Sequence, residues 1–382
     1  MMRRITPYIH QQPAWPAFTW QHAALEQLLG QVRYQQGHLL GRLEALGVEL
    51  RSEATLRTLT LDVLKSSEIE GEILPPASVR SSLAHRLGLE RGGLPATDRR
   101  VEGVVAMMLD ATQQAGQPLT AQRLYGWHHA LFPTGYSGLH PLQVGSWRTG
   151  PMQVVSGPMG RERVHYEAPP AEVLQEQMQQ FLDWFNGSPE LDPVLKAGLA
   201  HFWFVTIHPF DDGNGRIARA IADLQLTRAD GTGQRFYSMS AQIQAERQQY
   251  YDLLETSQRG TLDLTPWLTW FLGCLGRALT AAGHTLAQVL SKAHFWELHQ
   301  QTTLNERQRR LLTRLLDGFE GKLTSSKWAR MAKCSQDTAG RDIADLVAKG
   351  ILGRDSAGGR STNYRLLWPD APGIYDSSFN AH

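Results

Sequence analysis

The chain has few features of an exported or membrane-bound protein. Its 382 residues include only two cysteines, Cys274 and Cys334, so it offers neither a disulfide framework nor a cysteine-based zinc site. The longest apolar stretch, around residues 267–275, is too short to span a bilayer. The Met-Met-Arg-Arg start is not followed by the apolar segment of a signal peptide. We therefore expect no membrane association and a cytoplasmic location.

A large excess of charge is also missing, because the formal net charge is +1. The charge is nevertheless spread unevenly. Residues 303–368 hold 13 Lys and Arg against 7 Asp and Glu, a local excess of +6. A basic tail on a mildly acidic body is typical of nucleic-acid contact, whereas a protein that binds polyanions along its whole length is excluded.

One segment, residues 207–219, concentrates the residue types that polyphosphate chemistry needs. It reads Ile-His-Pro-Phe-Asp-Asp-Gly-Asn-Gly-Arg-Ile-Ala-Arg. Gly213, Asn214 and Gly215 form a turn whose backbone N–H groups can point into one concavity that suits an anion. Strong helix formers follow this turn, so the positive end of a helix dipole would face the same point. The segment therefore predicts a phosphate site.

Charged and titratable residues flank the turn. Arg216 and Arg219 are three residues apart on the predicted helix and share a face, and planar guanidinium groups suit phosphate oxygens. His208 can accept a proton near neutrality, so it can act as a base toward an attacking hydroxyl. Asp212 is placed to hold a hard cation that bridges phosphate oxygens, and Asp211 is less well placed. Together these residues indicate a site for a nucleoside triphosphate.

The fixed positions of this segment resemble the signature of the Fic protein adenylyltransferases, His-x-Phe-x-Asp/Glu-Gly-Asn-Gly-Arg-x-x-Arg. The resemblance implies an enzyme that transfers AMP from ATP to a Ser, Thr or Tyr hydroxyl of a target protein. His208 would deprotonate this hydroxyl, Asp212 would hold Mg²⁺, the Gly-Asn-Gly turn would anchor phosphates, and Arg216 and Arg219 would bind the outer phosphates of ATP. Phe210 would fix the loop in the core.

We expect an all-α protein in three parts: an arm and helical pair over residues 1–90, the Fic helical bundle with a small β-hairpin flap over 91–300, and a winged helix-turn-helix domain over 301–382. In the last part, three short helices precede two β-favouring runs that flank a Gly-rich turn. Such domains bind DNA or dock onto proteins, so DNA is an open partner. A homodimer is also left open.

An inhibitory segment is predicted at the end of the second helix. Ser52 is expected to cap this helix, which would run from Glu53 to Glu70. Ser66 and Glu70 lie one turn apart and share a face. With the glycine that follows, they resemble the Ser/Thr-x-x-x-Glu-Gly/Asn inhibitory motif found near many Fic domains. The resemblance implies that Glu70 pairs with Arg219 and keeps the enzyme autoinhibited.

A β-hairpin is predicted over 152–166, because two β-favouring runs flank a turn rich in Gly and Pro. It is expected to be the one strand-like region of the body. The resemblance makes it a flap that pairs with an extended piece of the target by strand addition, and a purely structural hairpin is the alternative. The candidate flap contacts are Val154, Val155, Val164 and His165.

Tyr250 and Tyr251 lie in a later predicted helix, over residues 240–257. The resemblance makes one of them a candidate contact for adenine, and packing alone explains both about as well.

Two other functions remain open. One is a DNA-binding transcriptional regulator whose body serves as a sensor, and the other is a hydrolase in which Glu70 activates a water that removes AMP from the target. The sequence does not identify the target.

Overall fold

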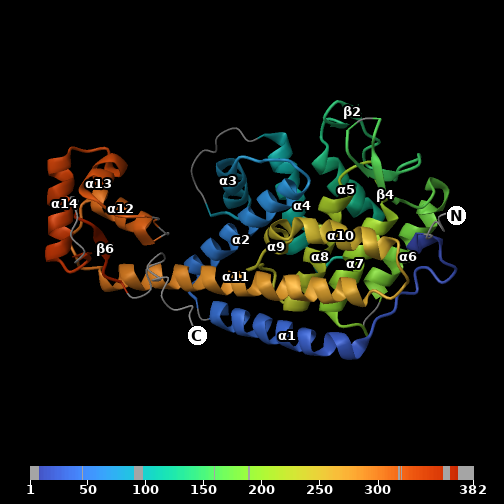
Figure 1. The fold of residues 1–382 in the computed structure, drawn as a ribbon, viewed down its shortest axis with the longest axis horizontal. Coiled ribbons are helices and arrows are strands. Elements are labelled where there is room, and N and C mark those ends of the chain that lie inside the picture. Colours follow the sequence, from blue (N-terminus) through green and yellow to red (C-terminus); the bar gives the residue numbers. More distant parts are fainter. Residues whose placement is uncertain are drawn as a thin grey trace. The chain divides into compact units, whose positions relative to one another are not determined.

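The computed structural model describes residues 8–44, 46–89, 98–158, 160–187, 190–316, 319, 321–355 and 362–368. This described part holds fourteen α-helices and three two-stranded antiparallel sheets, so the predicted all-α class is confirmed (Figure 1). The chain forms two compact units, Met1–Ala282 and Gly283–His382. The three-part division at residues 90 and 300 stays a prediction, and its first boundary adjoins residues 90–97, outside the described ones.

The first unit begins with η1 (Ile9–Gln11) and the predicted helical pair, α1 (His22–Glu44) and α2 (Val48–Ile69), followed by α3 (Pro76–Arg86). The predicted cap at Ser52 is wrong, because α2 already begins one turn earlier. Gly47 precedes its first turn, and Glu49 within that turn interacts favourably with the helix dipole. The last turn of α2 ends where the sequence predicted, with Glu70 as the next residue.

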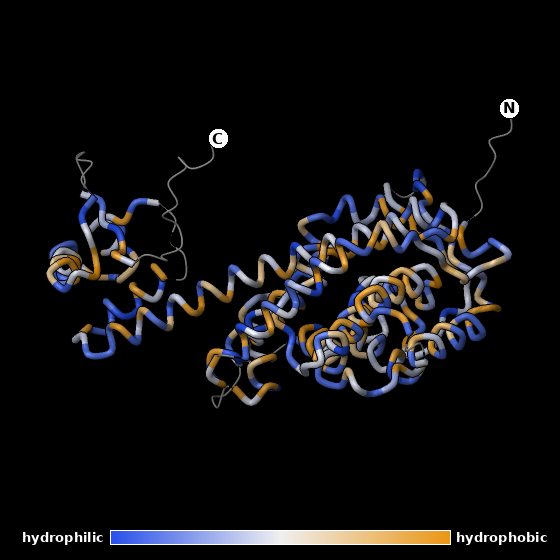
Figure 2. Tube along the Cα trace, turned by 90° about the horizontal axis from the view of Figure 1, so that it is seen from below, coloured by the Kyte–Doolittle hydropathy of each residue, from blue (hydrophilic) through white to orange (hydrophobic). Residues whose placement is uncertain are grey.

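The first unit continues with eight further helices, of which α7 and α8 are the most buried. The eight are α4 (Arg99–Gln113), α5 (Ala121–Leu131), α6 (Leu174–Gly187), α7 (Pro193–Ile207), α8 (Asn214–Asp230), α9 (Met239–Ala245), α10 (Arg247–Gln258) and α11 (Thr265–Leu298), whose end lies in the second unit. Helix α7 is buried on all sides and packs along α8. Along the longer helices at the surface, hydrophobic and hydrophilic residues alternate every few positions, as expected of helices with one buried face (Figure 2).

Two small hairpins interrupt the helices of this unit. The predicted one consists of β3 (Gln153–Ser156) and β4 (Arg163–Glu167), with Val154 opposite Tyr166 and an irregularity before Val155. A second hairpin, β1 (Tyr136–Ser137) and β2 (His140–Pro141), shows that the expectation of a single strand-like region was wrong. Strands of two residues on either side of a glycine turn are too short to show the alternation of apolar and polar residues by which a strand is recognised in a sequence.

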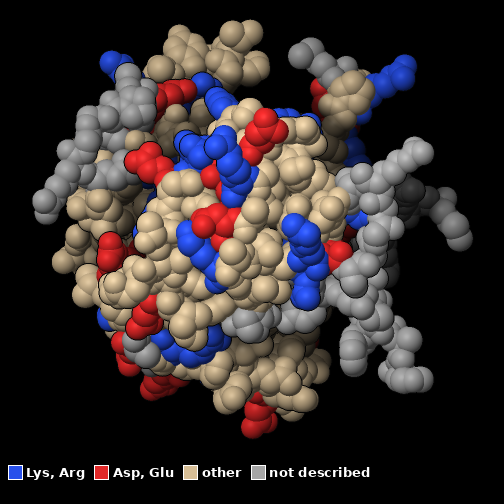
Figure 3. Space-filling model, turned by 90° about the vertical axis from the view of Figure 1, so that its left-hand side faces the viewer, with Lys and Arg blue, Asp and Glu red and all other residues tan. Residues whose placement is uncertain are grey.

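The second unit contains α12 (Glu306–Leu316), α13 (Ser325–Ala332), α14 (Gln336–Ala348), β5 (Leu352–Arg354) and β6 (Tyr364–Leu366). The two strands pair antiparallel, and a core around Trp328 and Leu312 joins the helices to them. This order of elements is the predicted one, while winged-helix identity and DNA binding stay predictions. On the face drawn in Figure 3, the described Lys and Arg side chains lie among Asp and Glu rather than in one unbroken basic patch.

Every helix in the described ranges is too short or too polar to cross a membrane.

Candidate active site

The predicted site lies on the loop that joins the end of α7 to the start of α8. His208 turns the chain out of α7 with a left-handed backbone conformation, φ 52 and ψ 57. Its Nδ1–H donates to the Val205 carbonyl at 3.0 Å, which leaves the lone pair on Nε2. Burial lowers the pKa of His208, and the bond to Val205 partly opposes this shift. The imidazole is therefore a neutral base at physiological pH.

The loop after His208 is fixed by Phe210 and Asn214. Phe210 is fully buried and stacks on His128, with ring centroids 4.2 Å apart. Its N–H donates to Asn214 Oδ1 at 3.0 Å, and Asn214 Nδ2 donates to its carbonyl at 2.8 Å. Phe210 thus occupies the core position that the sequence predicted for it, and its two bonds to Asn214 brace the loop from within.

The glycines of the turn are required for different reasons. Gly213 has φ +80, and a Cβ there would lie 2.9 Å from Phe132 Cε2. A Cβ on Gly215 would lie 2.3 Å from Glu70 Oε1. The Glu70 carboxylate therefore occupies the space beside the first turn of α8, where a helix N-terminus favours an anion.

Asp212 is held by its neighbours before the turn. Its Oδ1 accepts from the Gly213 N–H at 2.5 Å, and its Oδ2 accepts from Ser137 Oγ at 2.5 Å. Sequence reasoning missed Ser137, which belongs to the unexpected hairpin β1–β2. No three His, Cys, Asp or Glu side chains in the described ranges gather as metal ligands do. A hard cation at Asp212 would thus take its other ligands from phosphate or water oxygens.

Arg219 is buried against the end of α2. Its Nε donates to Ser66 Oγ at 3.0 Å, its Nη2 donates to the Ser66 carbonyl at 2.9 Å, and Nη2 lies 2.9 Å from Glu70 Oε1. Burial opposes its charge, but the nearby Glu70 carboxylate together with Tyr250 and Tyr251 outweighs burial, and the pKa of Arg219 is raised. The structure thus brings the three residues of the predicted inhibitory contact together. Its Nη1 is buried without a hydrogen-bond partner.

Arg216 makes a second ion pair that sequence reasoning missed. Its Nη1 lies 3.0 Å from Glu72 Oε2, and its guanidinium covers the Phe132 ring at 5.0 Å. Its Nε is buried without a hydrogen-bond partner. A signal was available in the sequence, because a second glutamate follows Glu70 two residues later, just as a second arginine accompanies Arg219.

Some of these groups line one hollow of about 460 Å³, whereas His208 and Arg219 are not among the described residues of its wall. Its wall includes the carboxylates Glu70, Glu72 and Asp212, the Arg216 guanidinium and the ring of Phe132. Residues 136–138 of the β1–β2 hairpin close one side. The hollow therefore places the predicted cation ligand, one of the two predicted phosphate ligands and the inhibitory segment around the same space.

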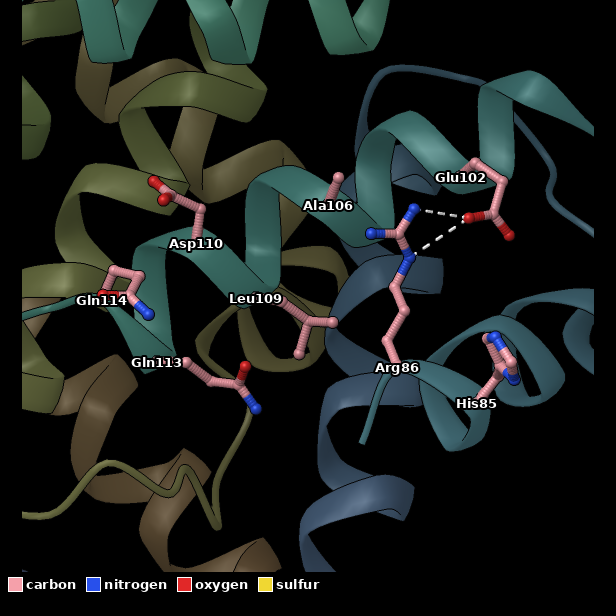
Figure 4. A pocket seen from close by; sticks show the side chains of 8 residues that line it. All are labelled: His85, Arg86, Glu102, Ala106, Leu109, Asp110, Gln113 and Gln114. Carbon is pink, nitrogen blue, oxygen red and sulfur yellow. Dashed lines mark hydrogen bonds and ion pairs between the residues drawn. The ribbon is translucent and has the colours of Figure 1, made fainter. Parts of the chain in front are cut away.

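A larger hollow, of about 620 Å³, lies between α3 and α4 (Figure 4). Its lining consists of His85, Arg86, Glu102, Ala106, Leu109, Asp110, Gln113 and Gln114. Arg86 and Glu102 pair with each other at 2.7 Å, and Asp110 accepts from Trp127 Nε1 and Arg123 Nε, each at 2.6 Å. Since its charged groups are already paired and no residue of the 207–219 segment lines it, we assign it no role in catalysis.

The two tyrosines differ in accessibility. Tyr250 is buried, and its hydroxyl is hydrogen-bonded to His201 Nε2 at 2.9 Å. Tyr251 is 36% exposed, and its hydroxyl donates to the Ile69 carbonyl at 3.3 Å. The adenine contact stays a prediction, and accessibility favours Tyr251.

The flap candidates lie on β3 and β4. Val155 is exposed, while Val154 and Val164 are half-buried. His165 Nδ1 lies 2.6 Å from Glu255 Oε2, and its Nε2 lies 2.6 Å from Ser156 Oγ. Contact of these four residues with a target stays a prediction.

A neutral imidazole beside an anion-binding helix N-terminus with two buried arginines defines a phosphate-binding site with an adjacent base. Comparison with known proteins agrees with this class. Residues 118–226 match the Fic/DOC family, and residues 8–89 match a domain of unknown function, DUF4172. The region that matches the Fic/DOC family includes the whole 207–219 segment.

Relatives and solved structures carry the same family name. The chain is 33% identical over 250 residues to Protein adenylyltransferase Fic of Nematostella vectensis, covering 61% of this chain and 52% of that protein. It is 27% identical over 220 residues to the protein of that name from Drosophila willistoni, covering 57% and 40%. The chain thus spans about half the length of these relatives. A Fic family protein from Desulfovibrio desulfuricans G20 shares the fold, with 22% identity, a TM-score of 0.51, and coverage of 92% and 98%.

Proposed function

We propose that the protein is an adenylyltransferase that moves AMP from ATP to a Ser, Thr or Tyr hydroxyl of a target protein. The observation that carries this proposal is that Arg216 and Arg219, both buried at the start of α8, each keep an N–H without a partner. Buried donors are nearly always paired, so the two free groups indicate that an anionic ligand completes them. The names of the relatives support the nucleotide and the reaction.

The chemistry follows from His208. Its free Nε2 accepts the proton of the target hydroxyl, and the hydroxyl oxygen attacks the α-phosphorus of ATP. The bond from this phosphorus to the bridging oxygen of the β-phosphate breaks, and pyrophosphate leaves with the electron pair. Arg216, Arg219 and the N-terminus of α8 stabilise the negative charge that the leaving group gains. The product is a target protein that carries AMP in phosphodiester linkage.

The carboxylate of Asp212 and the hydroxyl of Ser137 are hard oxygen donors on the wall of the same hollow, so they fit Mg²⁺. When bound, the ion would neutralise charge on the phosphates. Asp212 would be its protein ligand, and Ser137 would hold this carboxylate in orientation.

Autoinhibition would act through both arginines. Glu70 holds Arg219 and Glu72 holds Arg216, so the phosphates of ATP must compete with two carboxylates. The negative charges of Glu70 and Glu72 also repel a polyphosphate. ATP that binds without displacing the carboxylates would lack both guanidiniums, and its α-phosphorus would not be held in line with the attacking hydroxyl. Release of the α2 end would restore the complete phosphate site.

The test is mass spectrometry of the purified protein and of a cell extract after incubation with Mg²⁺ and α-labelled ATP. We expect AMP to be added to protein by the wild type, more strongly by Glu70→Gly, and not by His208→Ala. Label transfer that persists in His208→Ala would refute the proposed role of the imidazole. Absence of transfer from both the wild type and Glu70→Gly would refute the proposed activity.

A further inference from the structure

The contact between α2 and α8 continues one turn beyond the residues already described. Ser66 and Glu70 bind Arg219 from the end of α2. Asp62 precedes Ser66 by four residues, and Asp223 follows Arg219 by four residues. These two acids lie within hydrogen-bonding reach of each other. The facing sides of the two helices are therefore in register, with one polar contact in each turn.

Both carboxyl groups of this last contact are buried. Asp62 is 3% exposed and Asp223 is 1% exposed. Asp62 Oδ1 accepts from Ser238 Oγ, and from the Ser240 N–H at 3.1 Å. Asp223 Oδ1 accepts from Arg235 Nη2 at 2.7 Å. Asp223 Oδ2 is also buried, and no donor in the described part of the chain reaches it. Asp62 is thus fully oriented as an acceptor, whereas Asp223 has one oxygen without a partner.

The charges around this pair favour one bound proton. Two ionised carboxylates would have to share the Arg235 guanidinium, which also faces Asp230. Burial and the Asp62 charge raise the pKa of Asp223 well above its ordinary value, although Arg235 and Arg219 oppose this shift. Two carboxyl groups that occupy one site commonly hold a single proton between them. A neutral Asp223 has one O–H, and the Asp62 carboxylate is the acceptor beside it.

We propose that Asp62 and Asp223 share one proton, and that this carboxyl–carboxylate hydrogen bond positions the inhibitory end of α2 on α8. The bond fixes α2 two turns before Glu70, so that Glu70 reaches Arg219 in a single register. The hydrogen bonds from the start of α9 keep the acceptor oriented. This inference rests on the proposed autoinhibition, and it assigns a positioning role to two acids that the proposed reaction does not use.

AMP transfer from α-labelled ATP to the proteins of a cell extract tests the positioning role. Asp62→Leu removes the acceptor and should raise transfer roughly fivefold, the lower end of the effect of losing a buried hydrogen-bond partner. Asp62→Asn should keep wild-type transfer, because its amide can donate to an ionised Asp223 and still accept from the α9 donors. Glu53→Gln is the matched control, since Glu53 is an exposed acid of α2 that pairs with Arg80 of α3.

The same substitution in the Glu70→Gly chain separates positioning from a general weakening of the fold. If Asp62 acts by placing Glu70 on Arg219, then Asp62→Leu should cause no further rise once Glu70 is absent. A similar rise in both backgrounds, or no rise in the wild-type chain, would overturn the positioning role. If the Leu variant does not fold, Asp62→Ser carries the test, because the core tolerates its shorter polar side chain more easily. It should raise transfer in the same direction.

Infrared spectroscopy of the full chain tests the shared proton without any assay of activity. At neutral pH the wild type should show the C=O stretching band of an un-ionised carboxyl group, which shifts in heavy water. The band should be absent from both Asp223→Asn and Asp62→Asn, because each variant leaves a single carboxyl group that ionises. A band that both variants keep, or no such band in the wild type, would overturn the shared proton.

The outcomes separate this inference from the proposed enzyme. Absence of transfer from the Glu70→Gly chain would refute the adenylyltransferase and the positioning role in its inhibition, while the infrared band would still be present. Transfer by Glu70→Gly without a response to Asp62→Leu would leave the enzyme intact and overturn only the positioning role.

Discussion

The segment 207–219 and the flap 153–167 are held in opposite ways. The backbone of the first is braced from within, by the two Phe210 bonds of Asn214 and the buried ring of Phe210. The flap is a surface hairpin held from one side by Glu255 of α10 and by Arg259 just after this helix. The difference fits the two tasks expected of these regions. A reaction that is the same for every target needs one fixed geometry, whereas recognition of an extended segment needs an open edge.

The fixed segment is nevertheless the one whose charged groups pair with a remote part of the chain. Both of its arginines are paired with carboxylates from the end of α2 and the residues after it, about 150 positions earlier in the sequence. Described residues of the flap make no such pair with α2. The proposed autoinhibition would therefore act on phosphate binding and leave target recognition unchanged, a separation that variants can break.

The largest effect should come from the base. His208→Ala should lower AMP transfer by roughly 10²- to 10⁴-fold, the usual contribution of a general base, while ATP still binds. Transfer is measured with α-labelled ATP, and ATP affinity by calorimetry. His38→Ala, an exposed histidine of α1, is the control and should transfer normally.

The bracing of the loop predicts a loss of stability. Gly213→Ala should reduce the free energy of unfolding by about 2–4 kcal/mol, because the new Cβ meets Phe132 and the positive φ becomes strained. Gly231→Ala is the matched control, since that residue has φ +65 with no atom within 4 Å of the added Cβ. It should lose only about 1–2 kcal/mol from strain. Urea unfolding measures both, and equal losses would contradict the role of the Phe132 contact.

Release of Arg219 should raise activity. Glu70→Gly removes a partly buried ion pair on the order of 1–3 kcal/mol, so transfer should rise about fivefold or more. Glu68→Gln is the control because Glu68, in the same turn of α2, pairs with Lys65 rather than with either arginine. A similar rise with Glu68→Gln would mean that negative charge in general, and not the pair, is responsible.

Release of Arg216 should have a smaller effect. Glu72→Gln should raise transfer by about two- to fivefold, since the pair is similar in length but Arg216 keeps its contact with Phe132. In the double variant Glu70→Gly/Glu72→Gln, transfer should rise by more than the product of the two single increases if both guanidiniums bind one triphosphate. Two groups that bind the same ligand are energetically coupled. Initial rates of AMP transfer to the proteins of one cell extract, compared between the single and double variants, measure this effect. No gain from Glu72→Gln in either background would exclude Glu72 from inhibition.

The smallest effect concerns pH. Burial lowers the pKa of His208 below its ordinary value of 6.5, so Nε2 stays unprotonated as the pH falls to that value. Transfer by the Glu70→Gly variant should therefore remain on its plateau at pH 6.5 and decline only at lower pH, as the imidazole takes up a proton. A pH profile of initial rates checks this. A midpoint at or above 6.5 would contradict the lowered pKa.

The sequence predicted most of the site because its residues are contiguous. His208 to Arg219 form one segment with fixed spacing, and Ser66 and Glu70 form a second short motif at a helix end. Helices were equally accessible, since amphipathic spacing marks α12 and α14 almost to the residue. These helices could be predicted because the spacing of apolar residues within each segment is enough to mark it as a helix.

The missed features depend on tertiary contact. Only the pair of Glu72 with Arg216 had a signal, the doubling of both the glutamate and the arginine. Glu72 meets Arg216 across 144 positions, and Ser137 meets Asp212 across 75, so neither contact lies within one stretch of sequence. The same holds for Tyr250, whose burial against His201 could not be distinguished from the exposure of Tyr251 next to it. The start of α2 was misplaced because a serine inside a helix looks like a cap.

The double hydrogen bond of Asn214 has a consequence for the lifetime of the protein. Asn-Gly sequences lose ammonia when the glycine nitrogen attacks the side-chain carbonyl carbon. Here both polar atoms of the amide are held by Phe210, and Gly215 lies inside a helix that keeps its nitrogen from this approach. Deamidation should therefore be slow in the folded chain and fast once the chain unfolds, which peptide mapping of aged samples can measure. An aspartate formed there could no longer donate to Phe210, so a molecule that has once unfolded for long would refold without its phosphate turn.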